Sequence, residues 1–171
     1  SSILTTVRVE NNAQLAIAPY YYFTASIYMG ECTSSRVALM TAKSSDTSLY
    51  FAKINGEQVW KLVENYLDHT EDEFSITNKY ELPILSGMKI TVQKEENGFL
   101  LKDIVVDQEK IDKEKEYSIL LTDTTMSVLK KINPECEIWQ LGNTTLSSAW
   151  TVAMANGQQP SAPEDYIEVE K

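Results

Sequence analysis

The sequence predicts an α+β fold in which helices are layered on mixed β-sheets, and three observations carry this prediction. Apolar side chains recur every three or four positions over residues 55–67, which is typical of one face of an amphipathic helix. Residues 47–54, directly before it, have the composition of a β-strand. Further on, Asn97-Gly98 separates two β-rich runs and predicts a hairpin, because both residues tolerate positive φ. Mixed strands and helices argue against an all-α or all-β class.

The helix of residues 55–67 has a clear start and a clear apolar face. Asn55 is expected to cap its first turn, and Gln58 to return the hydrogen bond in a variant of the capping box. We expect the apolar face, Trp60 included, to pack into the core. That face is formed by Val59, Trp60, Leu62, Val63, Tyr66 and Leu67.

Upstream of this unit, residues 3–9 and 14–18 are expected to form strands, and residues 35–40 a short helix. Four aromatic residues follow the second strand: Tyr20, Tyr21, Tyr22 and Phe23. They could form a stacking surface, since each ring supplies apolar area and each tyrosine a hydroxyl. The alternative is that alternate rings pack into the core while the others cover its edge.

Downstream, residues 107–116 are charged and are expected to form a solvated connection to a buried strand at residues 117–121. A helix over residues 126–132 should stop before Pro134. Asp123 lies between the strand and the helix. We expect it to be the N-cap of the helix, with a contact to a ligand as the alternative.

The chain closes with a predicted strand at residues 137–141 and a helix at residues 145–157, which uses Gly157 as its C-cap. We expect a single domain over residues 1–163, because a chain of 171 residues needs no second core. Residues 164–171 are expected to form an acidic, extended tail on the surface of that domain.

The net charge of −10 argues against nucleic acid and anionic membranes as partners, because phosphate groups are bound by clustered Lys and Arg. No apolar run approaches the ~20 residues of a membrane span, so we expect no membrane contact by this segment. Acidic residues gather at residues 71–73 and 164–170. They are expected to be solvated surface, with a patch that binds a partner as the alternative.

The sequence offers no catalytic or metal-binding set of its own. Two-metal hydrolysis of a phosphate ester needs clustered His, Asp and Asn ligands. The single histidine, His69, is expected only to follow the central helix, where the helix dipole favours a cation. Cys32 and Cys136 form either one disulfide or two buried thiols, and no Cys/His cluster indicates zinc. We therefore expect no cofactor in this chain and no enzyme activity from it alone.

Several motifs, in their order along the chain, resemble the C-terminal domain of the 5′-nucleotidase family. Val63-Glu64-Asn65 lies where the family helix ends in Leu-Glu-Asn, and Ser86-Gly87 precedes the hairpin as Ser-Gly does in the family. The strand of residues 116–123 ends in Asp, as the family strand ends in Asn-Asp-aromatic. The similarity in order and spacing extends from about Gln14 to the end of the chain.

The resemblance implies a substrate-side domain that closes on a nucleotide or nucleoside. The divalent metal pair would belong to an N-terminal metallophosphatase domain of the same parent chain, which this sequence lacks. The first residues show no signal peptide, which fits either a cytosolic protein or a piece of a longer, processed chain. Since the family is mostly exported, the resemblance favours the piece, and with it an extracellular, periplasmic or cell-surface location.

The groups that bind the nucleotide in the family are largely replaced in this sequence. Thr24 stands near the position of a family Arg, residues 44–47 replace a Pro-Phe-Gly-Asn loop, and Thr124 replaces an aromatic residue. A predicted helix takes the place of a Gly-Gly-Asp-Gly loop. One interpretation is therefore a structural or protein-interaction module that keeps only the family scaffold. If a ligand does bind, we expect it to contact Tyr20, Tyr21, Tyr22, Phe23 and Asp123.

Overall fold

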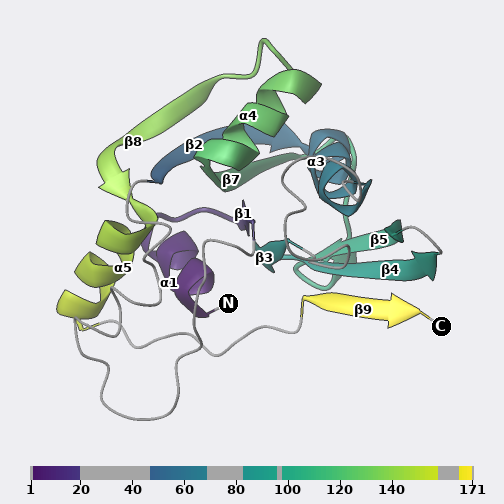
Figure 1. Cartoon of the computed structure of the whole chain (residues 1–171), viewed down its shortest axis with the longest axis horizontal. Coiled ribbons are helices and arrows are strands. Elements are labelled where there is room, and N and C mark those ends of the chain that lie inside the picture. The colour runs from purple at the N-terminus through teal and green to yellow at the C-terminus, as the bar shows by residue number, and fades with distance from the viewer. Residues whose placement is uncertain (1, 20–46, 69–82, 96–97, 158–165, 171) are drawn as a thin grey trace.

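The computed structural model describes residues 2–19, 47–68, 83–95, 98–157 and 166–170, and its elements carry the labels of Figure 1. The helices are α1 (Ser2–Glu10), α3 (Gly56–Asp68), α4 (Asp123–Ile132) and α5 (Leu146–Ala155). The strands are β1 (Leu15–Ala18), β2 (Ser48–Asn55), β3 (Ile84–Ser86), β4 (Lys89–Glu95), β5 (Gly98–Val106), β6 (Glu109–Lys110), β7 (Glu116–Thr122), β8 (Ile138–Thr145) and β9 (Ile167–Glu170).

The strands form two mixed sheets. In the five-stranded sheet the order is β3-β1-β7-β2-β8, with β1 and β7 parallel and the other neighbours antiparallel. In the four-stranded sheet the order is β6-β5-β4-β9, where β4 and β5 form the predicted hairpin and β9 runs parallel to β4. The predicted α+β class, with helices layered on mixed sheets, is confirmed.

Alternation along the strands gives the five-stranded sheet two apolar faces. Leu15 and Ile17 of β1 belong to one buried cluster, together with residues of α3, α4 and the four-stranded sheet. Ala16 and Ala18 belong to a second cluster, together with residues of α1 and α5. Figure 1 shows α4 on one side of β2 and β7, and α1 and α5 side by side on the other.

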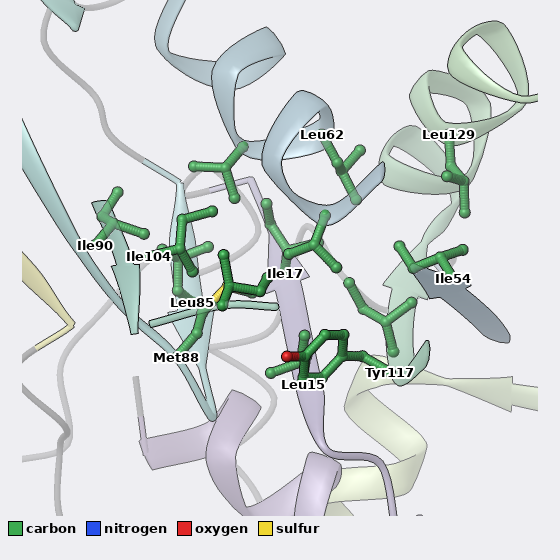
Figure 2. Packing of buried hydrophobic residues seen from close by; sticks show 14 of the residues in the cluster. Leu15, Ile17, Ile54, Leu62, Leu85, Met88, Ile90, Ile104, Tyr117 and Leu129 are labelled. Carbon is green, nitrogen blue, oxygen red and sulfur yellow. The ribbon is translucent and has the colours of Figure 1, made fainter. Parts of the chain in front are cut away.

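Helix α3 joins the two sheets into one core. It packs against β5 of the four-stranded sheet and against β2 and α4 on its other side. Figure 2 shows Leu62 of α3 and Leu129 of α4 in one cluster with Ile17 of β1 and Ile104 of β5. Both sheets therefore share a single buried volume.

The start of α3 forms as predicted. The backbone N–H of Gln58 donates to Asn55 Oδ1 at 2.9 Å, and the backbone N–H of Asn55 donates to Gln58 Oε1 at 3.0 Å. The two side chains thus satisfy backbone donors that a helix start would otherwise leave unpaired. The strand before the helix, predicted at residues 47–54, is confirmed as β2.

Trp60 does not lie in the core as predicted, because its indole sits at the margin of the apolar stripe. The ring is only partly buried, its Nε1–H donates to Glu64 Oε1 at 2.7 Å, and Lys113 Nζ lies 5.0 Å from the ring centre. An indole has a polar end that such a border position satisfies. The fully buried tryptophan is Trp150 of α5, in the second cluster.

The predicted strand at residues 3–9 is wrong, because these residues form helix α1. Their β-branched composition favours a strand, but Ile3, Leu4 and Val7 have helical spacing and are all buried against the sheet and α5. Strand propensity depends on what a segment packs against, and the apolar face of a sheet accepts a helix as well as a strand. Tertiary packing therefore decides the conformation of this segment.

Arg8 fastens α1 to the Ser-Gly motif before the hairpin. Its Nε–H donates to Ser86 Oγ at 2.8 Å, and its Nη1 donates to the carbonyl oxygens of Ala13 and Gln14 at 3.2 and 3.1 Å. Ser86 Oγ donates in turn to Thr5 Oγ1 of α1 at 2.9 Å. Ser86 of the Ser-Gly motif, which resembles the Ser-Gly of the family, thus holds the N-terminal helix in place.

The remaining strand and helix predictions are mostly confirmed. Strand β1 begins one residue later than the predicted segment 14–18, β7 includes the predicted 117–121, and α4 ends before Pro134. The charged connection at residues 107–116 also contains the short strand β6, and the strand predicted at residues 137–141 extends to Thr145 as β8.

The remaining predictions concern the C-terminal part of the chain and segments that lie outside the described residues. Helix α5 is confirmed, but its C-cap is Asn156 and not Gly157 as predicted; Gly157 follows the cap at a φ of 78°. The extended tail pairs with β4 as strand β9. The helix predicted at residues 35–40 and His69 lie outside the described residues.

Truncation of Trp150 should destabilise the fold far more than truncation of Trp60. Trp150→Ala removes a fully buried side chain and should lower the free energy of unfolding by about 3–5 kcal/mol. Trp60→Ala, at a partly buried position, should cost about 1–2 kcal/mol. Urea denaturation of both variants measures the difference, and equal losses would contradict the assignment of Trp150 to the core.

Gly87 should tolerate alanine less well than Gly142. Gly87 has a φ of 78°, and a Cβ there would overlap the carbonyl oxygen of Gln14. Gly142 also has a positive φ, 55°, but a Cβ there meets no heavy atom within 4 Å. Gly142→Ala should therefore cost only the left-handed backbone, about 1–2 kcal/mol, and Gly87→Ala clearly more. Thermal unfolding of the two variants ranks them, and the reverse order would refute this account.

Candidate functional site

Four strands begin or end at the same end of the five-stranded sheet. The parallel neighbours β1 and β7 end there, at Ala18 and Thr122. The antiparallel strand β2 begins there with Ser48, and β8 ends there with Thr145, which is paired with Ser48. We call this region, together with Asp123, the strand-end edge. Ligands of mixed α/β folds commonly bind where parallel strands end, which makes it the candidate site.

Asp123 links two strands at this edge through its carboxylate. Its Oδ2 accepts a hydrogen bond from the backbone N–H of Ser48 at 2.9 Å. Its Oδ1 accepts one from the hydroxyl of Tyr50 at 2.8 Å. Because Asp123 directly follows β7 while Ser48 and Tyr50 belong to β2, the carboxylate fixes the start of β2 against the start of α4.

The prediction that Asp123 is the N-cap of α4 is wrong, since Asp123 is the first residue inside the helix and Thr122 is the cap. The backbone N–H of Thr122 donates to Thr125 Oγ1 at 2.6 Å, and Thr125 Oγ1 donates to the carbonyl of Thr122 at 2.9 Å. An acidic side chain in the first turn still benefits from the helix dipole. Here its oxygens reach across to β2 instead of back to the helix backbone.

The pKa of Tyr50 is raised above its usual value of 10.0. The main cause is the hydrogen bond to Asp123, followed by burial and by the negative charge of Asp123, and a hydrogen bond with Ser48 opposes them. Tyr50 is therefore a neutral donor throughout the physiological range. The pair works as a fixed hydrogen-bonded connection, and each carboxylate oxygen already accepts one protein hydrogen bond.

The described polar side chains around this pair are neutral, apart from the Asp123 carboxylate itself. Gln140 Nε2 of β8 donates to Ser48 Oγ at 3.3 Å, so Ser48 contacts the amide of Gln140 through its hydroxyl and the carboxylate of Asp123 through its backbone N–H. None of the side chains of Ser48, Tyr50, Asp123, Gln140 and Thr145 is cationic. Phosphate groups in proteins are bound mainly by Arg, Lys or free helix N-terminal amides.

The starts of α5, near this region, and of α3, far from it, have partners for several of their backbone amides. At α5, the backbone N–H of Leu146 donates to the carbonyl of Thr47 at 3.1 Å, and that of Ser148 to Thr145 Oγ1 at 3.1 Å. At α3, at the opposite end of β2, the backbone N–H groups of Gly56 and Glu57 donate to carbonyls of the loop before β7. These donors stabilise the scaffold and are occupied within it.

The same loop before β7 also pairs electrostatically with α3. Lys113 Nζ lies 3.0 Å from Glu57 Oε2, and this hydrogen-bonded contact lowers the pKa of Glu57. The Glu57 side chain is solvated, so the pair is a surface contact of small energy. It places Lys113 over the ring of Trp60, away from the strand-end edge.

Of the residues predicted to contact a ligand, the structure describes Asp123 alone. The four aromatic residues, Tyr20 to Phe23, lie outside the described residues, whose first range ends at Pro19. Ser48, Tyr50 and Gln140 were not among the residues predicted from the sequence. The strand composition of residues 47–54 placed Tyr50 on a strand, but its contact with a residue that lies 73 positions away needs the fold.

Three other features bear on possible chemistry. Within the described ranges, no three His, Cys, Asp or Glu side chains are grouped so that they could hold a metal ion. Cys136 is a buried free thiol whose pKa is raised by burial, and Cys32 lies outside the described residues. None of the helices in the part of the chain that the structure describes is long and apolar enough to cross a bilayer.

A comparison with protein families gives one match. The family described as "5'-nucleotidase, C-terminal domain" matches residues 2–130 of this chain. The matched range contains α1, both strands of the parallel pair, and the Tyr50–Asp123 contact. No curated protein matches the chain.

Solved structures share the fold at low sequence identity. The 5′-nucleotidase precursor from Thermus thermophilus is 15% identical, with a TM-score of 0.76 over 98% of this chain and 34% of its own. The NAD nucleotidase of Haemophilus influenzae is 16% identical, with a TM-score of 0.75 over 99% and 32%. The sulfate thiohydrolase SoxB of a Thermus species is 11% identical, with a TM-score of 0.69 over 98% and 31%. This chain therefore spans about a third of the length of these structures.

The Tyr50–Asp123 contact should give the fold a specific sensitivity to alkaline pH. Because the pKa of Tyr50 is higher in the folded than in the unfolded chain, the contact stabilises fully below about pH 10 and is lost as the pH rises through the raised pKa. Tyr50→Phe should be less stable than the natural chain at neutral pH and lose less stability above pH 10.

Unfolding free energies between neutral pH and pH 11 measure this difference, and ultraviolet titration of tyrosine follows the pKa directly. Asp123→Asn should lower the pKa of one tyrosine, whereas Glu109→Gln, at an exposed carboxylate of β6, should not. Identical pH profiles for Tyr50→Phe and the natural chain would refute the role assigned to this contact.

Proposed function

We propose that this chain is the substrate-side domain of an exported 5′-nucleotidase-like metallophosphoesterase. The proposal starts from the family: the chain belongs to the family of 5′-nucleotidase C-terminal domains. The observation that carries the proposal is the family match over residues 2–130, combined with a fold that accounts for about a third of each similar structure. In this proposal an N-terminal metallophosphatase domain supplies the metal pair and the hydrolytic step. The present chain supplies the surface that positions the organic part of the substrate.

The strand-end edge is the surface proposed for this role. It lies where β1 and β7 end, and it offers hydroxyl, amide and carboxylate groups from Ser48, Gln140 and Asp123. Such groups recognise a ribose or a base by hydrogen bonds, and the aromatic run at residues 20–23 would add stacking. Asp123 would act mainly as a positioning residue, because both of its oxygens already hold β2.

The proposal includes a pocket in which the usual nucleotide-binding groups are largely replaced. Residues 44–47 contain neither Phe nor Asn, Thr124 has no ring, and helix α4 begins where the family loop would carry glycines. The edge therefore depends on fewer contacts than the family pocket. We expect weak recognition, with little discrimination between bases.

The second candidate function is a non-catalytic structural or interaction module. It is favoured by one observation: the carboxylate of Asp123 accepts hydrogen bonds from the hydroxyl of Tyr50 and from the backbone of Ser48, both in β2, as in a structural contact. The fold also occurs in a protein named for sulfate thiohydrolysis, so the scaffold by itself does not specify a nucleotide. Either function places the chain outside the cytosol in our proposal, since its family is mostly exported.

Titration of the chain with adenosine, AMP and UMP separates the two candidates. The first predicts saturable heat in calorimetry, which Tyr21→Ala should weaken about tenfold by removing a stacking ring worth about 1–3 kcal/mol. Trp139→Ala is the matched control, because Trp139 is an exposed ring on the opposite face of β8 from Gln140 and should leave binding unchanged.

The absence of saturable binding at millimolar ligand would favour the module and reject the substrate-side domain. The coding sequence upstream of this segment provides an independent test. An Asp-x-His motif followed later by Asn-His-Glu or Asn-His-Asp is expected there, since a two-metal centre needs such ligands. An upstream sequence without clustered His, Asp and Asn would contradict the proposed parent enzyme.

A further inference from the structure

Strand β8 leaves one edge of the five-stranded sheet open. Among the described strands it pairs only with β2, and the sheet order ends with it. Figure 1 shows β8 at the margin of this sheet, outside β2. The backbone N–H and C=O groups on the outer side of such a strand are available to another strand. Natural proteins usually protect an edge of this kind with charged residues or proline.

The edge of β8 carries neither charge nor proline. Residues 138–157, which include β8 and α5, contain no Asp, Glu, Lys, Arg, His or Pro, although charged residues make up 23% of the chain. From Ile138 to Gln140 the pairing with β2 is regular, and the register shifts beyond that, near Gly142 with its φ of 55°. Depletion of charged residues is typical of the buried centre of a protein–protein interface.

Apolar side chains accompany this edge on the face of the sheet that also carries α1 and α5. Trp139 is exposed by 47%, and its ring centre lies 6.4 Å from that of Phe51 on β2. Leu141 is half-buried on the same face, since it lies two positions further along the strand. Strand addition uses main-chain hydrogen bonds together with side chains that become buried, and β8 offers both.

The charges at the two ends of β8 favour antiparallel pairing between identical strands. Glu135 and Glu137 are exposed directly before β8, whereas α5 follows it and has no acidic residue in its first turn. In a parallel pair of two copies, these glutamates would lie side by side and repel each other. In an antiparallel pair they approach the start of the other copy's α5, where the helix dipole favours a negative charge. The two ends of the strand are therefore complementary to each other.

We propose that the β8 edges of two copies of this chain pair antiparallel about a twofold axis at Gln140 and join their sheets into one. A twofold pairing needs a surface that is complementary to itself, and β8 meets this condition in its open backbone, its lack of charge and its complementary ends. Two copies with a net charge of −10 repel each other over most of their surface, so an uncharged strand is where they can meet. Trp139 of each copy then lies opposite Leu141 of the other.

Analytical ultracentrifugation of the 171-residue chain over a range of concentrations tests for the dimer. The natural chain should dimerise reversibly. Trp139→Glu should weaken the dimer at least about tenfold, because it removes the aromatic ring and places a carboxylate on each edge. Val152→Glu is the matched control: Val152 is also an exposed apolar residue, at 54%, but it lies further along α5 and away from the β8 edge. This variant should dimerise like the natural chain.

Opposite charges at Gln140 test both the identity of the partner and the register. Gln140→Glu and Gln140→Lys should each dimerise poorly alone, because like charges face each other across the axis. Mixed in equal amounts, they should form a heterodimer several-fold more abundant than either homodimer in native mass spectrometry. The control mixture combines Gln108→Glu and Gln108→Lys, at the exposed turn between β5 and β6. All of its chains should dimerise through β8, and the heterodimer should reach only its statistical share.

Three results would overturn the proposal. A natural chain that stays monomeric up to millimolar concentration would assign the edge to another occupant, such as the proposed upstream domain. A dimer that Trp139→Glu leaves intact would use another surface. A heterodimer at no more than its statistical share in the Gln140 mixture would rule out pairing across Gln140. Since that mixture gains a dimer which its components lack, misfolding of a variant cannot produce the expected result.

Discussion

The fold depends on the burial of α3 against two sheets at once. Its apolar stripe contacts β5 on one side and β2 and α4 on the other, so the five-stranded and four-stranded sheets share one core through this helix. Leu62 and Val63 are fully buried within it, and each such side chain stabilises the fold by about 1.5–3 kcal/mol. The capping pair Asn55 and Gln58 sets where the helix begins and hence which face it presents.

This arrangement separates the scaffold from the candidate site. Strand β2 carries α3 at one end and the strand-end edge at the other, so the main core lies away from the edge. Contact groups at the edge can then change while the fold persists, which agrees with a TM-score of 0.76 at 15% identity. Asp123 has both roles: its carboxylate binds Ser48 and Tyr50 and so belongs to the scaffold as much as to the site.

The features predicted correctly are those set by neighbours in the sequence. The cap of α3, the β4–β5 hairpin, the end of α4 before Pro134 and the α+β class all follow from local spacing and turn residues. Two of the errors occur where contacts with other elements contribute. Residues 3–9 form a helix because the sheet and α5 cover them, and Trp60 lies at the margin of α3 because Lys113 and Glu64 hold its ring there.

The sequence by itself determined the class of fold and the position of its central helix, because periodicity, capping residues and turn residues act over a few positions, and the order of its motifs resembled the family that the comparison then showed. Only the tertiary structure decided the partners of Asp123, the role of Ser86 and Arg8, and the pairing of the C-terminal strand with β4. These contacts join residues 73 to 78 positions apart, or a tail to a hairpin, and no local pattern encodes which distant group will lie within hydrogen-bonding distance.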